Sequence, residues 1–144
     1  MELNEVEKLI LKLLYKADCK IKGNTMFQKI MYILKSEYQD RIHELKSLQF
    51  KLHYYGPFSR DVENMLIRLV LRGLLIREVE PVIDYLRYNY ILSEKGREKA
   101  KELYHSENRR EVIDAMANKV RELNEKPLQE VISKAYRIAE RNGL

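Results

Sequence analysis

Residues 69–97, LVLRGLLIREVEPVIDYLRYNYILSEKGR, limit the fold more narrowly than any other stretch of the chain. Gly73 follows an apolar helical run, and glycine commonly ends a helix because it tolerates left-handed dihedrals. Two segments rich in Leu, Ile, Val and Tyr come next, and Ser93 then stands where a helix N-cap belongs. The stretch therefore predicts a helix end, a β-hairpin with a long tip and a helix start. The expected pieces are a strand at 74–80, a loop at 81–87 and a strand at 88–92.

Upstream of this stretch, hydrophobic spacing predicts three helices and a strand. Asn4 is typical of the start of a capping box for the first helix, and Thr25 with Gln28 predicts another for the second. The Gly56-Pro57 pair is expected to end the strand, because proline lacks a backbone donor, and Ser59 then caps the third helix. The predicted elements are helices at 5–17, 25–38 and 60–72 and a strand at 48–54.

Downstream of Ser93, three amphipathic patterns predict three further helices, the last of which begins after Pro127. The apolar stripes of the last two helices need cover, either by packing back on the domain or by dimerisation. We therefore expect a mainly α fold with a small antiparallel β-sheet and C-terminal amphipathic helices, all in one compact unit.

The composition is that of one globular domain: 144 residues, of which 45% are hydrophobic and 34% charged. The single cysteine cannot form an internal disulfide, and the three histidines are too far apart to suggest a metal site or a catalytic triad. No apolar run is long enough for a membrane span, and the first residues are acidic where a secretory leader would be basic. We therefore expect a cytoplasmic protein with no metal, no cofactor and no contact with a membrane.

Ser59 raises the question of catalysis, because it stands in the aromatic-rich stretch HYYGPFSRDVEN at residues 53–64. A nucleophile elbow requires Gly-x-Ser-x-Gly and a base elsewhere, whereas only the serine is present. A helix cap explains the same serine, with Asp61 and Glu63 in the positive first turn of the helix. We therefore expect no enzyme activity, and a serine hydrolase is the least favoured alternative.

Leu69–Ile76 together with Tyr90–Arg97 resembles the signature of winged-helix regulators of the MarR and PadR kinds. In that signature a helix leads into Gly-Leu-Ile, a wing follows, and Tyr-x-Leu-Thr-x-x-Gly-Arg begins the next helix; here Ser93 replaces the usual Thr. The resemblance implies a winged-helix-like domain at residues 1–105. It also implies a C-terminal helical extension at 106–144, which packs on the domain or pairs two copies in a homodimer.

A second resemblance covers residues 25–76. Thr25–Tyr32 and the corner Tyr55–Ser59 are similar to the Gln-Lys-Leu and Tyr-Gly-Pro motifs of SocA-like Panacea antitoxin domains and of YwgA-like proteins. This chain has Pro-Phe-Ser where the antitoxin group often has Pro-Val. The resemblance implies a non-catalytic protein–protein interaction module, antitoxin-like or adaptor-like.

The leading hypothesis, which the first resemblance implies, is a transcriptional regulator that binds double-stranded DNA. Its third helix would contact a groove through Arg60, Asn64 and Arg68. Arg77 and Arg87 flank the hairpin tip and would hold phosphates. About 20 residues and a strand replace the usual tight turn before this helix, so the docking geometry differs from that of a standard helix-turn-helix. The net charge of +5 is spread over both halves of the chain, which permits a nucleic-acid partner without requiring one.

The competing hypothesis is a module that binds another protein. At 100° per residue, Ile67 and Leu71 fall on the outward face of the third helix, where apolar side chains suit a protein partner. Tyr85 lies among apolar residues of the hairpin tip, which are either part of an interface or covered by a C-terminal helix. The corner around Tyr55 and Phe58 would also meet this partner, although both rings are expected to anchor the corner in the core.

Overall fold

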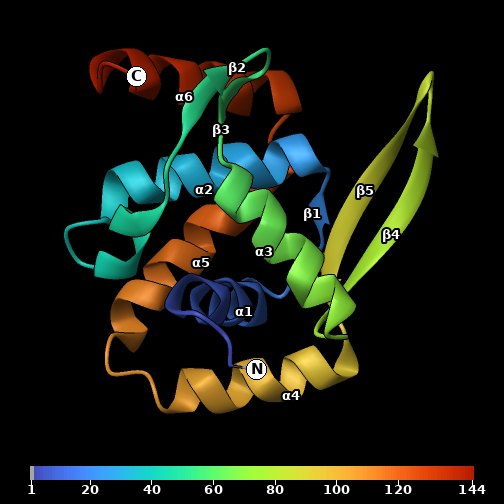
Figure 1. The fold of residues 1–144 in the computed structure, drawn as a ribbon, viewed down its shortest axis with the longest axis vertical. Helices are drawn as coiled ribbons and strands as arrows, with labels where there is room; N and C mark the ends of the chain where they lie inside the picture. Colours follow the sequence, from blue (N-terminus) through green and yellow to red (C-terminus); the bar gives the residue numbers. More distant parts are fainter. Residues whose placement is uncertain (1) are drawn as a thin grey trace.

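Six α-helices, one 3₁₀ helix and five strands make up residues 2–144, the part of the chain that this computed structural model describes (Figure 1). The fold is mainly helical with a small antiparallel sheet, as the sequence predicts. The helices are α1 (Glu5–Ala17), α2 (Asn24–Tyr38), the 3₁₀ helix η1 (His43–Ser47), α3 (Arg60–Leu71), α4 (Glu94–His105), α5 (Arg110–Glu125) and α6 (Leu128–Arg141). The strands are β1 (Ile21–Lys22), β2 (Lys51–His53), β3 (Gly56–Phe58), β4 (Leu75–Val82) and β5 (Tyr85–Leu92).

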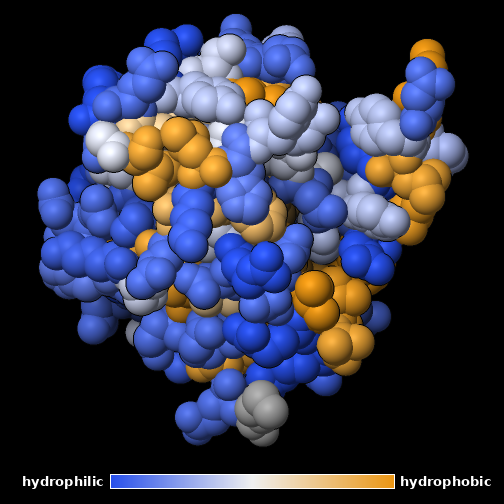
Figure 2. Space-filling view, turned by 45° about the horizontal axis from the view of Figure 1, so that its top comes forward, coloured by the Kyte–Doolittle hydropathy of each residue, from blue (hydrophilic) through white to orange (hydrophobic). Residues whose placement is uncertain are grey.

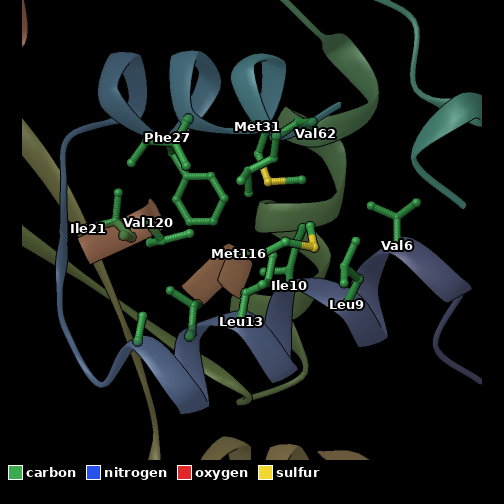
Figure 3. Packing of buried hydrophobic residues seen from close by; sticks show 14 of the residues in the cluster. Val6, Leu9, Ile10, Leu13, Ile21, Phe27, Met31, Val62, Met116 and Val120 are labelled. Carbon is green, nitrogen blue, oxygen red and sulfur yellow. The ribbon is translucent and has the colours of Figure 1, made fainter. Parts of the chain in front are cut away.

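The hydrophobic core forms around α1, whose apolar side chains are buried. Figure 3 shows Leu9 and Ile10 of α1 together with Met31 of α2 and Met116 of α5 in one cluster. Burial of one such side chain contributes roughly 1.5–3 kcal/mol of hydrophobic stabilisation. Helix packing therefore supplies most of the apolar burial, and the two small sheets contribute less.

The two C-terminal helices complete this core. α5 packs on α1, and α6 packs on α2. Their apolar stripes are covered by the chain itself, so packing on the domain is favoured over a stripe left open for dimerisation. The buried side chains are Ile113, Met116, Ala117, Val120 and Leu123 of α5 and Val131, Ile132, Ala135, Ile138 and Ala139 of α6.

A network of charged side chains joins the start of this extension to the rest of the domain. Lys12 Nζ lies 2.5 Å from Glu107 Oε1, and both residues are buried. Arg109 donates to Glu107 and, through both terminal nitrogens at 2.8 Å, to Glu44. Hydrogen bonds from the Arg109 guanidinium and the Lys12 ammonium hold the pKa of Glu107 well below its usual range. Because such charge-assisted bonds are strong, the network ties α1 and η1 to the segment before α5.

The three-stranded sheet has the order β1–β5–β4 and is antiparallel throughout. β1, in which Ile21 pairs with Tyr90, was not predicted, because two residues are too few to show strand periodicity. The loop expected at 81–87 is wrong. β4 continues to Val82 and β5 begins at Tyr85, so the two strands form one long hairpin with a two-residue turn.

Pro81 lies inside β4 without breaking the hydrogen-bonded ladder. The Ser93 N–H donates to the Leu74 carbonyl, and bonded positions alternate along an antiparallel pair, so residue 81 faces the free edge of β4. A missing N–H is tolerated at such an edge position. At the turn, Asp84 adopts a left-handed φ of 71°, which aspartate accepts more readily than most residues. A tight hairpin therefore forms where proline suggested a loop.

A second hairpin, β2 with β3, replaces the single strand that was expected to end at the Gly56-Pro57 pair. Gly56 instead begins β3 with a φ of 105°, and His53 pairs with it across a turn formed by Tyr54 and Tyr55. The expectation that Tyr55 anchors this corner in the core is wrong, because its side chain is 56% exposed at the tip of the turn. Phe58 is half-buried and stacks on the His53 ring.

Two side chains of α2, Gln28 and Lys29, hold the chain just before α3, and we call this pair the α2 clasp. The Gln28 Nε2 donates to the Ser59 carbonyl at 2.9 Å, and its Oε1 accepts from the Ser59 N–H at 2.8 Å. The Lys29 Nζ donates to the Pro57 carbonyl at 2.9 Å. The clasp therefore satisfies buried backbone groups of the corner and fixes where α3 begins.

The capping box predicted from Thr25 and Gln28 is wrong. α2 begins at Asn24 after Gly23, and no side chain caps it. The Gln28 amide is instead buried against the end of the β2–β3 hairpin. There it bonds the N–H and the carbonyl of Ser59, which would otherwise lack partners.

We expect Gln28→Ala to destabilise the protein by about 2–4 kcal/mol, because it leaves two buried backbone groups unsatisfied at about 1–3 kcal/mol each. Urea unfolding followed by circular dichroism measures the loss. Gln129→Ala, an exposed glutamine of α6, is the matched control and should change stability by less than about 0.5 kcal/mol. Equal stability of the two variants would show that the clasp does not hold the corner.

Lys29 predicts a pH dependence of stability, because burial lowers the pKa of its ammonium to about 8 from 10.5. Between these pH values the unfolded chain binds more protons than the folded one, so stability rises with pH. The gain in unfolding free energy from pH 7 to pH 10 is about 2 kcal/mol for this group. We expect wild-type protein to gain that much relative to Lys29→Met in urea titrations at both pH values. Parallel pH profiles of the two proteins would contradict it.

Candidate interaction surface on α3 and the hairpin

α3 turns one face to the core and the other to solvent, as its periodicity predicts. The Ser59 Oγ accepts the Val62 N–H at 3.3 Å, which confirms the predicted cap. Ser59 is fully buried, and its backbone N–H and carbonyl are held by the clasp. The buried residues of α3 are Val62, Met65, Leu66 and Leu69, and the exposed ones include Arg60, Asn64, Ile67 and Leu71.

The three α3 residues that were predicted to contact nucleic acid differ in their surroundings. Arg60 and Asn64 are exposed near the start of the helix. Arg68 is also exposed, but its Nε lies 3.1 Å from the Oε2 of the buried Glu7 and ties α3 to α1. Arg60 and Asn64 therefore have side chains available for a ligand, whereas Arg68 already serves a structural contact.

The two arginines predicted to position the hairpin lie on its opposite faces. Arg87 pairs with Glu80 across the strands, with Nη2 2.6 Å from Oε1, and this bond lowers the pKa of the Glu80 carboxyl. Arg77 is an odd number of residues from Glu80 in the same strand, so it points to the other face, where its guanidinium lies 4.8 Å from the centre of the Tyr88 ring. The two arginines therefore do not form one basic face on the hairpin.

Apolar side chains are exposed along α3 and over both faces of the hairpin. Leu71 is 80% exposed and Ile83, in the turn, 88%. Figure 2 shows hydrophobic atoms gathered near the base of the projecting hairpin and again along it to its tip. We call this set the α3–hairpin surface; its members are Ile67, Leu71, Ile76, Val79, Ile83, Tyr85 and Leu86.

The structure thus answers the open question about the hairpin tip, because no C-terminal helix covers Tyr85. Ile67, Leu71 and Tyr85 were predicted to meet a partner, and all three are exposed. Ile76 and Val79 were missed. The pairing of β4 with β5 could have revealed them, since strand residues alternate between faces and this hairpin extends beyond the helices that could cover it.

α3 and the hairpin together carry no net charge. Between residues 60 and 92, five arginines are balanced by five carboxylates. Duplex DNA presents one negative charge per about 1.7 Å, so its affinity depends on a surplus of cations that this surface lacks. The arginines are Arg60, Arg68, Arg72, Arg77 and Arg87, and the carboxylates are Asp61, Glu63, Glu78, Glu80 and Asp84.

Other kinds of site are not evident in the described part of the chain. Among residues 2–144, no group of three or more His, Cys, Asp and Glu side chains is placed to hold a metal ion. Within the same range, no helix has both the length and the apolar character that crossing a membrane requires. Burial raises the pKa of the Cys19 thiol, which disfavours the reactive thiolate.

No protein-family model matches this chain, and no curated protein matches it either. The α3–hairpin surface is therefore interpreted from its own geometry and charge.

Proposed function

We propose that the protein is a non-catalytic interaction module that docks another protein through the α3–hairpin surface. The observation that carries this proposal is the combination of seven exposed apolar side chains with five arginines balanced by five carboxylates. Large exposed apolar side chains are typical of protein-binding sites, and a surface without net charge gains little from a polyanion.

The partner that fits this surface is a polypeptide that presents an apolar face with little net charge. The hairpin projects from the body of the domain, so a partner can pack beside α3 and also reach the hairpin (Figure 1). Leu71 at the end of α3 and Val79 in β4 offer the apolar contacts that such packing needs. The expected cytoplasmic location is part of the same proposal.

The test replaces Leu71 and Val79 together by serine in a tagged protein expressed in its own source cells. Both side chains are more than half exposed, so we expect stability to change by less than about 0.5 kcal/mol each. We expect the double variant to lose a partner that wild type co-purifies in stoichiometric amount, with affinity at least about tenfold lower by calorimetry.

Leu52→Ser is the matched control, because Leu52 is 46% exposed and lies on the β2–β3 hairpin, outside the α3–hairpin surface. It should retain the partner. Recovery of the same proteins by wild type and the Leu71/Val79 variant would exclude this surface. Light scattering of purified wild type at increasing concentration decides whether a second copy of the chain is the partner.

Duplex DNA is the second candidate ligand, in line with a transcriptional regulator. It is favoured by the element order, in which α3 precedes an antiparallel hairpin within the sheet β1–β5–β4, because this order matches the winged-helix outline that residues 69–97 resemble. Arg60, Asn64 and Arg77 are exposed and would make the contacts. The balance of charges on the same elements makes this ligand less favoured than a protein.

Fluorescence anisotropy with a random-sequence duplex at 50 and 200 mM salt tests this candidate. If DNA binds through these elements, Arg60→Ala and Arg77→Ala should each weaken binding of every sequence and lower the slope of log affinity against log salt by about 1. Arg141→Ala, an exposed arginine of α6, is the control and should leave the slope unchanged. Absence of binding at the lower salt concentration would remove DNA from the candidates.

A further inference from the structure

We propose that the β2–β3 hairpin is a separate binding site for single-stranded nucleic acid, in which unpaired bases stack on its aromatic rings. Tyr54 is 86% exposed and Tyr55 56% at the tip of this hairpin. Their rings contact each other edge to face, with centroids 4.9 Å apart. Exposed aromatic rings beside cations are the usual platform for unpaired bases, because every base has a face that stacks.

The hairpin holds these rings in place. The Tyr136 hydroxyl donates to the Tyr54 carbonyl at 3.1 Å, which fixes the backbone of the turn from the side of α6. Lys29 of the clasp bonds the Pro57 carbonyl, and the end of its side chain packs beside Tyr136 against Gly56. The turn is therefore supported from two helices, and the tyrosine rings remain outside. An ordered platform loses less entropy on binding than a mobile loop does.

The strands of the same hairpin and the start of α3 line a cleft of about 280 Å³. Lys51, His53 and Phe58 line it, and the His53 and Phe58 rings are stacked with centroids 4.7 Å apart. Arg60, at the start of α3, lines the same cleft. In the described part of the chain neither Lys51 nor Arg60 forms an ion pair, so both cations are available to phosphate.

The charge of the cleft favours nucleic acid over a protein partner. Lys51 and Arg60 outnumber the one carboxylate that lines it, in contrast to the balanced charges of the α3–hairpin surface. The one acidic side chain of the cleft, Asp61, accepts the Gln49 N–H at 3.2 Å. A polyanion with exposed bases therefore finds both its phosphates and its bases matched here.

This site is distinct from the α3–hairpin surface. The cleft lies at the start of α3, whereas Leu71 lies at its end, roughly 16 Å away at 1.5 Å per helical residue. A ligand at one end therefore leaves the other end accessible, and the two proposals can fail independently.

The experiment measures anisotropy of a fluorescein-labelled 15-nucleotide single strand of mixed sequence, as DNA and as RNA, and of the corresponding DNA duplex. We expect wild type to bind the single strands more tightly than the duplex, with an affinity that falls as salt rises. The double variant Tyr54→Ala/Tyr55→Ala should bind them about tenfold more weakly. Lys51→Ala should lower the salt dependence.

His105→Ala is the matched control, because this exposed ring lies at the end of α4, on the opposite side of the domain from the β2–β3 hairpin (Figure 1). It should bind the single strands as wild type does. Thermal unfolding should be the same for all variants, since none of the replaced side chains is buried. Equal affinity of wild type and the Tyr54/Tyr55 variant, equal affinity for duplex and single strand, or no binding at 50 mM salt would each overturn the proposal. Loss of a protein partner by the Tyr54/Tyr55 variant, without any nucleic-acid binding by wild type, would assign the hairpin to that protein instead.

Discussion

The bond pattern between Gln28 and Ser59 is the constraint on which the placement of α3 depends. A single amide side chain satisfies the N–H and the carbonyl of a buried residue, and the neighbouring Lys29 holds the carbonyl of Pro57. This arrangement holds the end of the connection between α2 and α3, which contains η1 and the β2–β3 hairpin. Because both residues of the clasp are buried side chains of α2, they fix the start of α3 and the adjoining strand β3 at once.

Both proposed binding surfaces follow from that placement. α3 is buried along one side only, so its two ends emerge beside different neighbours. At its start are the cations and rings of the β2–β3 hairpin, and at its end are apolar side chains that continue into the β4–β5 hairpin. The surface at the start of α3 suits a polyanion, and the surface at its end suits a protein face with little net charge. The two ends of α3 thus carry a basic surface and an apolar surface. The net charge of the whole chain does not reveal this difference.

Local signals in the sequence predicted most of the fold, whereas contacts between residues far apart in the sequence were not predicted. The caps at Asn4 and Ser93 were correct because a cap depends on residues three positions away. Gln28 has the same spacing from Thr25, yet its partner is 31 residues distant, so no local rule could find it. Pro81 was wrongly placed in a loop, because only the order of the strands shows that β4 is an edge strand, where proline is tolerated.

The prediction of the candidate site was likewise correct for local features and incomplete for contacts between distant residues. Helical periodicity placed Ile67 and Leu71 on the outward face correctly. It gave no warning that Arg68 is held by Glu7, or that Arg77 and Arg87 point in opposite directions, because both facts depend on pairings made in three dimensions. Tyr55 was expected to anchor the Gly-Pro corner in the core, whereas the turn carries its ring outward.

The two-residue turn at Ile83 and Asp84 lies far from the core, at the end of a ladder whose bonds are internal to the hairpin. Adding or removing two residues in each strand there would change the reach of the hairpin and preserve both the alternation of its faces and the bonded pair beside the turn. A change in the length of this one hairpin would therefore alter the surface proposed for docking without changing the helices that form the core.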